Sequence, residues 1–415
     1  MTTTSCARSS NATRRLAAGL AWASLMFAAH AVASEAPGAV NNVVGYYTDI
    51  AIGSDSFPVV SHYDATAGAL KVAKCANAAC TGAATLRTID TGGKGDFGSI
   101  AIGSDGLPVI SYRDFMLDAL RVAHCGDAAC ASGNTLTILD DPAGAAVGLY
   151  TSITVPGDGR PVISYHDFTA QSLKVAKCAD HACTSATTVT VDDPGNSVGL
   201  YTSIAISADG SPVISYYDAT ARALKVAKCA NAACTGTAAV ATVDDPPGGD
   251  VGAYTSIALG SDLLPVISYL DAGANALKVA KCGNPGCSAG NTITTIDGGP
   301  GVGSVGAFSA IANGADGRPV VSYYDNSGSL KVAKCANPVC TGAATVSTVD
   351  DSFNRVGLYT SITIGADERP VISYLDFSAG ALKVARCANT SCTGAATITT
   401  VDGPVFANGF EAPPP

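Results

Sequence analysis

The 415-residue sequence has few charged side chains, no long amphipathic pattern and a shortage of basic residues. Charged residues make up 14% of the chain and apolar residues 47%, which excludes an intrinsically disordered protein, because such proteins combine low hydrophobicity with high charge. Outside residues 1–33 no window shows a sustained helical period, so a helical fold is also excluded. Acidic residues outnumber basic ones by 34 to 24, which argues against a nucleic-acid partner, since phosphate contacts need clustered Lys and Arg.

Residues 1–33 have the pattern of a secretory signal peptide. Three arginines precede an apolar stretch from Leu16 to Ala29, and small residues at 31–33 are of the kind that a signal peptidase accepts before Ser34. The apolar stretch is too short to span a bilayer comfortably, although an uncleaved membrane anchor is the alternative. Removal of the three arginines would change the formal charge from −10 to −13, and an even 14 of the 15 cysteines would remain. We predict a secreted or periplasmic protein with no membrane span after cleavage.

One unit recurs seven times along the rest of the chain. In the fourth copy it reads Tyr201-Thr-Ser-Ile-Ala-Ile, then Asp209-Gly-Ser-Pro-Val-Ile-Ser-Tyr-Tyr-Asp, then Leu224-Lys-Val-Ala-Lys-Cys. The last cysteine of this pattern is Cys75 in the first copy and Cys387 in the seventh, 312 residues and six steps apart, so the mean period is 52 residues. A period of this length indicates a repeat architecture in which each unit is one supersecondary structure.

Each copy contains four short strand-like segments separated by turn residues. In the fourth copy they are Ser203–Ile206, Pro212–Tyr217, Ala223–Cys229 and Val240–Val243, bounded by Gly, Pro and Asp. Seven such units predict an all-β fold, a seven-bladed β-propeller with four antiparallel strands per blade. The alternative is an open stack of sheets such as a β-helix, whose coils are usually shorter and which would need distinct capping units.

The propeller is expected to cover residues 45–402. A short N-terminal leader, 34–44, would precede it, and a C-terminal tail, 403–415, would follow it outside the repeat. The first and last units are in phase, so no strand is expected to cross the point where the ring closes. We also expect a monomer.

Two cysteines separated by four residues recur in every copy. The first follows one strand and the second precedes the next, so a disulfide would close the hairpin between them. A structural zinc site would need four ligands, whereas each pair offers two with no repeated histidine nearby, and a redox motif would use a two-residue spacer. We predict one structural disulfide per blade, in the pairs Cys75–Cys80, Cys125–Cys130, Cys178–Cys183, Cys229–Cys234, Cys282–Cys287, Cys335–Cys340 and Cys387–Cys392.

Side chains that are identical in every copy are expected to build the fold, because a catalytic site is asymmetric. They include a turn aspartate such as Asp209, the proline three residues after it, and a second aspartate such as Asp218. Eleven of the twelve lysines lie in the Leu-Lys-Val-Ala-Lys segments. A basic patch is the functional alternative for these lysines. Because each copy also supplies aspartates, we predict a ladder of ion pairs between strands or blades.

The repeat resembles one that is common in exported bacterial proteins. Its segments Thr-Ser-Ile-Ala, Asp-Gly-x-Pro-Val-Ile-Ser-Tyr-x-Asp and Leu-Lys-Val-Ala are also similar in outline to the BNR/Asp-box repeats of sialidase-like propellers, over roughly residues 45–402. The Asp-box itself, Ser-x-Asp-x-Gly-x-Thr-Trp, is not matched, because Asp and Gly are adjacent here and Trp22 is the only tryptophan. The resemblance implies a sialidase-type propeller in outline.

Sialidase activity would further imply an arginine triad and a tyrosine nucleophile activated by a glutamate. Three glutamates follow residue 33: Glu35 and Glu411 lie in the terminal segments, and Glu368 lies in a tight turn. The resemblance therefore implies the fold without the catalytic residues.

Other kinds of chemistry find little support in the sequence. A Ser-His-Asp hydrolase would have only His62, His124, His166 and His181 to draw on, and none lies in a nucleophile-elbow context. A calcium loop needs roughly six to eight oxygen ligands, whereas the closest segment, 313–317, supplies one carboxylate. We predict no catalytic residue, no cofactor and no metal.

Positions at which the copies differ are better candidates for function. In a propeller, the loop after the second strand and the connection to the next blade share one face, and loops of this kind commonly bind ligands. Just before the second aspartate, five copies carry aromatic or polar side chains suited to a sugar or a peptide. These candidate ligand-binding residues are Tyr63, Arg113, His166, Tyr217 and Tyr324.

We predict a secreted, non-enzymatic binding or interaction propeller whose ligand is a glycan or a protein. The alternative is an extracellular glycan-active hydrolase or lyase that uses loop carboxylates with Arg113 or His166. Enzymatic use predicts one asymmetric charged cluster, whereas lectin-like use predicts equivalent pockets between blades.

Overall fold

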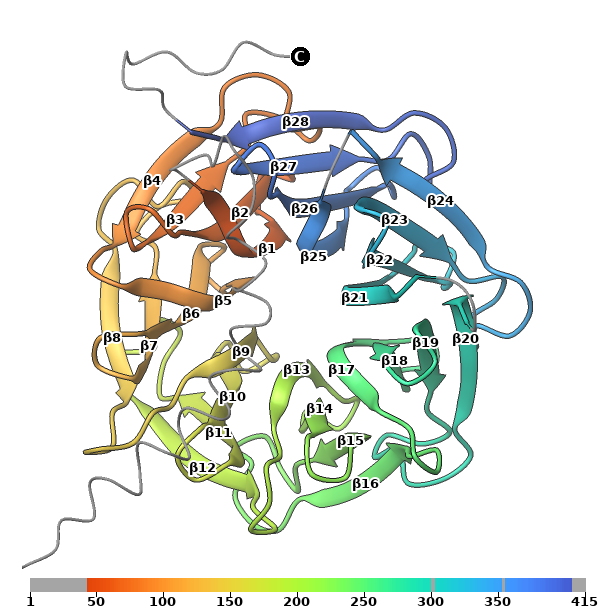
Figure 1. Cartoon of the computed structure of the whole chain (residues 1–415). Helices are drawn as coiled ribbons and strands as arrows, with labels where there is room; N and C mark the ends of the chain where they lie inside the picture. Colours follow the sequence, from red (N-terminus) through yellow and green to blue (C-terminus); the bar gives the residue numbers. More distant parts are fainter. Residues whose placement is uncertain (1–42, 300–302, 353–354, 405–415) are drawn as a thin grey trace, which may run out of the picture. The chain divides into compact units, whose positions relative to one another are not determined.

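The computed structural model describes residues 43–299, 303–352 and 355–404, which form seven four-stranded antiparallel sheets around a central axis (Figure 1). The four strands of each sheet are consecutive in the sequence. The predicted seven-bladed β-propeller is therefore confirmed, and the open stack of sheets is excluded. The predicted signal peptide, residues 1–33, lies outside the described residues, as do nearly all of the predicted leader and tail.

Within each blade the strands follow one another from the axis to the rim of the ring (Figure 1). Blade 1 consists of β1 (Val44–Ile52), β2 (Pro58–Asp64), β3 (Ala69–Lys74) and β4 (Thr85–Asp90). Blade 2 consists of β5 (Lys94–Ile102), β6 (Pro108–Asp114), β7 (Ala119–His124) and β8 (Thr135–Asp140). Blade 3 consists of β9 (Leu149–Thr154), β10 (Val162–Asp167), β11 (Ser172–Cys178) and β12 (Ala186–Asp192).

The remaining blades repeat this arrangement. Blade 4 consists of β13 (Leu200–Ile206), β14 (Pro212–Asp218), β15 (Ala223–Lys228) and β16 (Ala239–Asp244). Blade 5 consists of β17 (Val251–Leu259), β18 (Pro265–Asp271), β19 (Ala276–Lys281) and β20 (Thr292–Gly298). Blade 6 consists of β21 (Val305–Asn313), β22 (Pro319–Asp325), β23 (Ser329–Lys334) and β24 (Thr345–Asp350), and blade 7 of β25 (Val356–Ile364), β26 (Pro370–Asp376), β27 (Ala381–Arg386) and β28 (Thr397–Asp402).

The strands of blade 4 match the four segments expected for the fourth copy to within one residue at each end, except that the first begins three residues earlier, at Leu200. The described part of the chain contains no helix long and apolar enough to cross a membrane.

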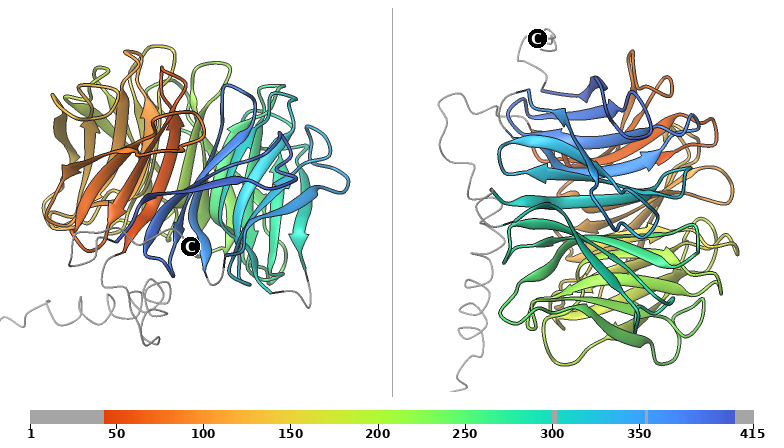
Figure 2. Two further views of the ribbon diagram at one scale, coloured as in Figure 1. Left: turned by 90° about the horizontal axis from the view of Figure 1, so that it is seen from above. Right: turned by 90° about the vertical axis from the view of Figure 1, so that its right-hand side faces the viewer.

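The strands run between two faces of the ring, which Figure 2 shows from the side. We call the face at which each first strand begins and each second strand ends the upper face. The lower face carries the turn between the first and second strands and the loop that contains the two cysteines. The second-to-third-strand loops, in which function was expected, therefore lie on the upper face.

Apolar side chains are buried mainly between neighbouring blades. Leu224 and Val226 of blade 4, for example, pack in one cluster with Ile267 and Tyr269 of blade 5, and all four are fully buried. Each pair of neighbouring blades is thus held together by removal of apolar surface from water, at about 25 cal/mol per Å².

The predicted ion-pair ladder is confirmed, and one of its two sets joins neighbouring blades. The Tyr269 hydroxyl of blade 5 donates to Asp244 of blade 4 at 2.7 Å, and the Lys278 ammonium lies 3.3 Å from the same carboxylate and 2.7 Å from Asp271 of its own blade. The second set stays within a blade: Lys281 lies 2.6 Å from the turn aspartate Asp262. The repeated Lys and Asp residues therefore fix how each blade sits on the next.

The ring closes through contacts between blades 7 and 1, and no strand is exchanged, as the phase of the repeats predicted. The Val44 amide of β1 donates to the Gly380 carbonyl at 3.1 Å. In blade 1, His62 occupies the position that Tyr269 has in blade 5. Its Nε2 lies 3.0 Å from Asp402 of blade 7.

All seven predicted disulfides are present, one in the lower-face loop of each blade. Their number indicates an oxidising, extracellular environment, because cytosolic proteins are kept reduced.

Candidate functional site

Seven aromatic side chains, one from the inner strand of each blade, surround the axis toward the upper face. The centroids of neighbouring rings lie 4.5–4.9 Å apart, and the rings are tilted against one another by 43–64°. These separations fall in the range of favourable aromatic contacts. We call this closed set the aromatic collar; its members are Tyr47, Phe97, Tyr150, Tyr201, Tyr254, Phe308 and Tyr359.

A bulge in each inner strand turns the collar residue toward the axis. In blade 1 the register between the first two strands shifts between the Tyr46–Tyr63 pair and the Asp49–Ser61 pair, and Tyr47 lies in that interval. Every collar residue has a left-handed backbone, with φ between 49° and 54°. This conformation is unfavourable for a bulky side chain, so packing of the seven aromatic side chains must compensate for it in each blade.

A cavity of about 230 Å³ lies on the axis at the collar and is lined by three consecutive residues from each inner strand. The lining consists of five tyrosines, five threonines, six serines, two phenylalanines, one glycine, one alanine and one aspartate. Sixteen of the twenty-one lining residues therefore carry a hydroxyl group. Such a surface suits a ligand that is itself rich in hydroxyl groups.

The collar tyrosines are buried next to one another. The rings of Tyr150 and Tyr254 contact that of Tyr201, and the ring of Tyr47 contacts that of Tyr359. Burial raises the pKa of these phenols well above the ordinary value, so they stay protonated and remain hydrogen-bond donors at neutral pH.

Serines two residues after the collar join neighbouring blades. The Ser203 hydroxyl of blade 4 accepts the Ile257 amide of blade 5 at 3.1 Å, and Ser152 accepts the Ile204 amide at 3.2 Å. These hydroxyls are held by the ring itself, which leaves the collar phenols as the polar groups most able to bond to a ligand.

Asp49 is the single carboxylate of the lining and replaces one of these serines. Its Oδ1 accepts from the Ser361 hydroxyl at 2.6 Å, and its Oδ2 accepts from the Ser99 hydroxyl at 2.9 Å and the Ile100 amide at 2.8 Å. Burial raises the pKa of the Asp49 carboxyl, although the hydrogen bonds act in the opposite direction. Both oxygens are thus occupied by blades 7 and 2.

The five residues predicted from sequence variation lie around the collar, one in each of five blades. The rings of His166, Tyr217 and Tyr324 lie 6.3–6.5 Å from the collar residue of their own blade. Tyr63 pairs with Tyr46, and Arg113 pairs with Asp96, in the residue pair next to the collar position. The structure brings the five to one face as a second circle around the collar.

Several of these side chains already have protein partners. The Tyr217 hydroxyl donates to Asp250 at 2.7 Å, and Arg113 is ion-paired with Asp118 while its guanidinium lies 5.2 Å from the centre of the Phe115 ring. Arg113 is therefore neutralised locally and stacked on an aromatic ring.

His166 is 2% exposed, and its Nδ1 lies 2.9 Å from the Val198 carbonyl, in the segment that leads into blade 4. Burial lowers its pKa to about 4, so the imidazole is neutral at neutral pH. This contact joins two blades and keeps the imidazole away from solvent.

The upper face is most unlike the repeat in blade 2. Phe115, Met116 and Leu117 in the loop after β6 are 55%, 71% and 49% exposed. Three consecutive exposed apolar side chains beside Arg113 break the sevenfold symmetry of this face.

Metal-ligating side chains come together at the other face. In the part of the chain that the structure describes, one group of three could hold a metal ion, formed by Asp105, His124 and His181. It lies at the lower face, since Asp105 is in the β5–β6 turn and His181 in a cysteine loop. Neither this group nor the collar was predicted from the sequence.

The collar had a visible signal in the sequence. Each copy carries an aromatic residue three positions before the first core isoleucine, as in Tyr201-Thr-Ser-Ile204. A residue type that recurs in every copy was taken to have a structural role, and the bulge that turns this position toward the axis has no sequence signature of its own.

Comparison with known proteins gives information on the fold alone. No family model and no curated protein matches the sequence. Among solved structures, an ulvan lyase of polysaccharide lyase family PL25 is similar with a TM-score of 0.57 and 11% identity, covering 88% of this chain and 97% of that one. The same lyase bound to -[GlcA(1-4)Rha3S]- matches with a TM-score of 0.56 and 9% identity, over 88% of this chain and 98% of that one.

Two further structures share the fold at similar distance. A puromycin hydrolase has a TM-score of 0.53 and 14% identity, over 88% of this chain and 54% of that one. A protein of unknown function from Dyadobacter fermentans has a TM-score of 0.51 and 12% identity, over 74% of this chain and 94% of that one.

Proposed function

We propose that the protein is a secreted, non-enzymatic carbohydrate-binding propeller that holds one unit of a neutral oligosaccharide at the aromatic collar. The observation that carries this proposal is the axial cavity of about 230 Å³, in which five tyrosines and two phenylalanines stand above a lining of threonine and serine. Sugars present apolar C–H faces and many hydroxyl groups, which match aromatic side chains and phenol hydroxyls respectively.

The size and charge of the cavity restrict the ligand. Drug-sized ligands occupy pockets of roughly 300–1,000 Å³, so a cavity of 230 Å³ suits a single sugar unit with the rest of the chain outside. Asp49 is the single carboxylate in the lining, which contains no basic side chain, and the whole chain has a formal charge of −10. Both features favour a neutral sugar over a polyanionic one.

The state of the candidate acid–base residues supports binding over catalysis. Burial holds the pKa of His166 at about 4 and its Nδ1 is bonded to the Val198 carbonyl, while Arg113 is ion-paired with Asp118. Asp49, the carboxylate in the cavity lining, accepts hydrogen bonds on both oxygens. The ulvan lyase with bound saccharide supports the proposal only in that a protein of this fold holds a sugar chain.

A glycan array followed by calorimetric titration of the best neutral oligosaccharide tests the proposal. The double variant Tyr150→Phe/Tyr254→Phe keeps both collar rings and removes two phenol hydroxyls. Each lost hydrogen bond should cost about 1 kcal/mol, or about fivefold in Kd. The matched control is Tyr216→Phe/Tyr269→Phe, which removes two hydroxyls that bond to Asp192 and Asp244 between blades. The control should bind like the wild type.

A blank array, or equal weakening of binding in both double variants, would refute the proposal. Cleavage of the bound oligosaccharide that is abolished in Arg113→Ala/His166→Ala would replace it with the enzymatic alternative.

A further inference from the structure

Blade 2 departs from the repeat at the end of its third strand. In the other six blades this position carries a cation that pairs with the turn aspartate of the same blade, namely Lys74, Lys177, Lys228, Lys281, Lys334 and Arg386. Blade 2 has His124 instead, with its Nε2 2.8 Å from Oδ2 of the turn aspartate, Asp105. A neutral imidazole can coordinate a metal ion through this nitrogen, whereas a lysine ammonium has no lone pair to do so.

Blade 3 departs from the repeat at the place that faces this histidine. The third residue after the first cysteine is His181 here, whereas it is Ala, Pro or Thr in the other copies. A cysteine loop also adjoins the third-strand cation of the preceding blade at another junction. A Cβ at Gly286 in blade 5 would lie 3.9 Å from Lys228 of blade 4. Two separate departures from the repeat therefore meet at the junction of blades 2 and 3.

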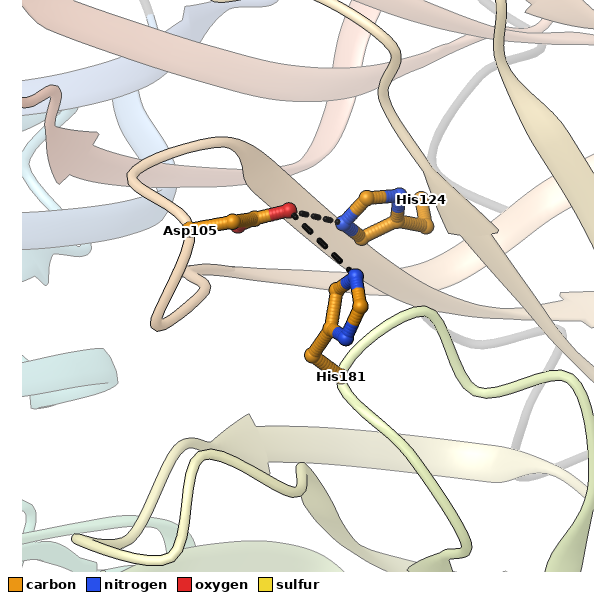
Figure 3. A group of neighbouring side chains, drawn as sticks. All are labelled: Asp105, His124 and His181. Carbon is orange, nitrogen blue, oxygen red and sulfur yellow. Dashed lines mark hydrogen bonds and ion pairs between the residues drawn. The ribbon is translucent and has the colours of Figure 1, made fainter.

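The three side chains converge on one point, as Figure 3 shows. The Nε2 atom of His181 lies 4.0 Å from Oδ2 of Asp105, and the two imidazole rings are 5.6 Å apart and nearly perpendicular. All three ligand atoms lie within 4.8 Å of one another. The side chain of His124 is 8% exposed, that of Asp105 27% and that of His181 55%. The buried side chain of His124 thus faces the exposed side chain of His181.

These positions fit a tetrahedral ion. Zn²⁺ takes nitrogen and carboxylate ligands at about 2.0–2.2 Å, which places neighbouring ligand atoms about 3.3–3.5 Å apart. The present separations from Asp105, 2.8 and 4.0 Å, lie on either side of that value. A shift of less than 1 Å by the exposed His181 ring brings its nitrogen to that spacing from Asp105.

We propose that Asp105, His124 and His181 form a zinc site that joins blades 2 and 3 at the lower face. Three protein ligands leave a fourth position for water on the exposed side. The ion takes the place of the ion pair that each other blade forms within itself, and it binds two blades together. Ca²⁺ and Mg²⁺, which prefer oxygen ligands, should not bind here.

Titration of Zn²⁺ into untagged, EDTA-treated, fully oxidised protein tests the proposal, and a thiol assay shows that no cysteine is free to bind the metal. The wild type should bind one Zn²⁺ per chain and unfold at a higher temperature in its presence, with no effect of Ca²⁺ or Mg²⁺. His124→Lys and His181→Ala each restore the residue of other copies, so both should fold. Each should weaken Zn²⁺ binding by at least about tenfold and lose the thermal shift.

Because the blades repeat, the same site can be built at a second junction by substitution. Lys177→His with Ala232→His places the same two substitutions at the junction of blades 3 and 4, beside Asp158. This variant should bind two Zn²⁺ ions per chain. Unchanged Zn²⁺ affinity in both His124→Lys and His181→Ala, or no binding by the wild type at millimolar Zn²⁺, would overturn the proposal.

Discussion

The carboxylate of Asp49 in blade 1 accepts a 2.6 Å hydrogen bond from the hydroxyl of Ser361 in blade 7, 312 residues later in the chain. Its other oxygen accepts from Ser99 and Ile100 of blade 2. One side chain therefore joins three blades at the point where the ring closes. Five of the other six blades have a serine in this position, and blade 6 has Ala310. The Ser203 hydroxyl, for example, accepts a backbone amide of one neighbouring blade. The closure relies on such side-chain bonds because no strand is shared between the first and last sheets.

Asp49→Ser should change how stability depends on pH. Burial raises the pKa of Asp49 in the folded protein above the ordinary value of 3.8. The folded state therefore binds this proton more tightly than the unfolded state does. The resulting stabilisation is complete below pH 3.8 and is lost as the pH rises through the folded-state pKa. Serine, which still accepts the Ile100 amide, does not titrate.

The measurement is the midpoint of urea unfolding for both proteins between pH 3 and pH 7. The stability of Asp49→Ser relative to the wild type should increase with pH. A difference that is constant, or that decreases with pH, would show that the hydrogen bonds to Asp49 outweigh the cost of burying its charge.

Much of the fold could be predicted because the same sequence unit recurs seven times. The 52-residue period set the number of blades, and the Cys-x4-Cys spacing predicted the disulfides, since both are local patterns. The similarity to BNR/Asp-box repeats stays a prediction beyond the shared architecture. The collar was not found, because its aromatic residues reach the axis only through a left-handed bulge.

Contacts between blades were harder still to foresee. His166 was predicted as a candidate ligand-binding residue, yet it is 2% exposed and its Nδ1 contacts the Val198 carbonyl, 32 residues later in the sequence. Asp105, His124 and His181 are spread over 76 residues, and only the stacking of blade 3 on blade 2 brings them together. A single sequence shows what each blade contains, but the position of one blade on the next follows from packing.

His62→Tyr should stabilise the protein by about 1 kcal/mol, because it restores the residue found in the other six blades. The Nδ1 atom of His62 is buried and has no hydrogen-bond partner, whereas a tyrosine hydroxyl can donate to Asp402 without leaving such an atom. The tyrosines at this position in the other blades bond to the equivalent aspartate at 2.5–2.8 Å. Calorimetric melting measures the gain. The reverse change in blade 4, Tyr216→His, should cost a similar amount, and a destabilised His62→Tyr would contradict this account.

Removal of one disulfide should weaken the protein without changing its fold. Cys229 and Cys234 close a short loop at a separation of 5 residues in blade 4. The chain-entropy model gives about 2 kcal/mol for a loop of this size, so Cys229→Ala/Cys234→Ala should lower the unfolding free energy in urea by about that amount. Reduction of all seven bonds should lower stability much further. If the oxidised wild type and the variant unfold at the same urea concentration, this loop contributes nothing through its disulfide.

Gly252→Ala should be among the most damaging small substitutions in the ring. Gly252 has φ +104°, and an added Cβ would lie 2.8 Å from the Leu224 Cα atom of the preceding blade. That atom belongs to the backbone of β15 and cannot move alone, so blades 4 and 5 would be pushed apart. We expect a loss of about 3 kcal/mol or more. Gly210 is the matched control, because its φ is +79° but no heavy atom lies within 4 Å of an added Cβ. Gly210→Ala should lose only the roughly 1 kcal/mol of a left-handed alanine, and equal losses in the two variants would show that backbone conformation, and not the spacing of the blades, requires glycine at position 252.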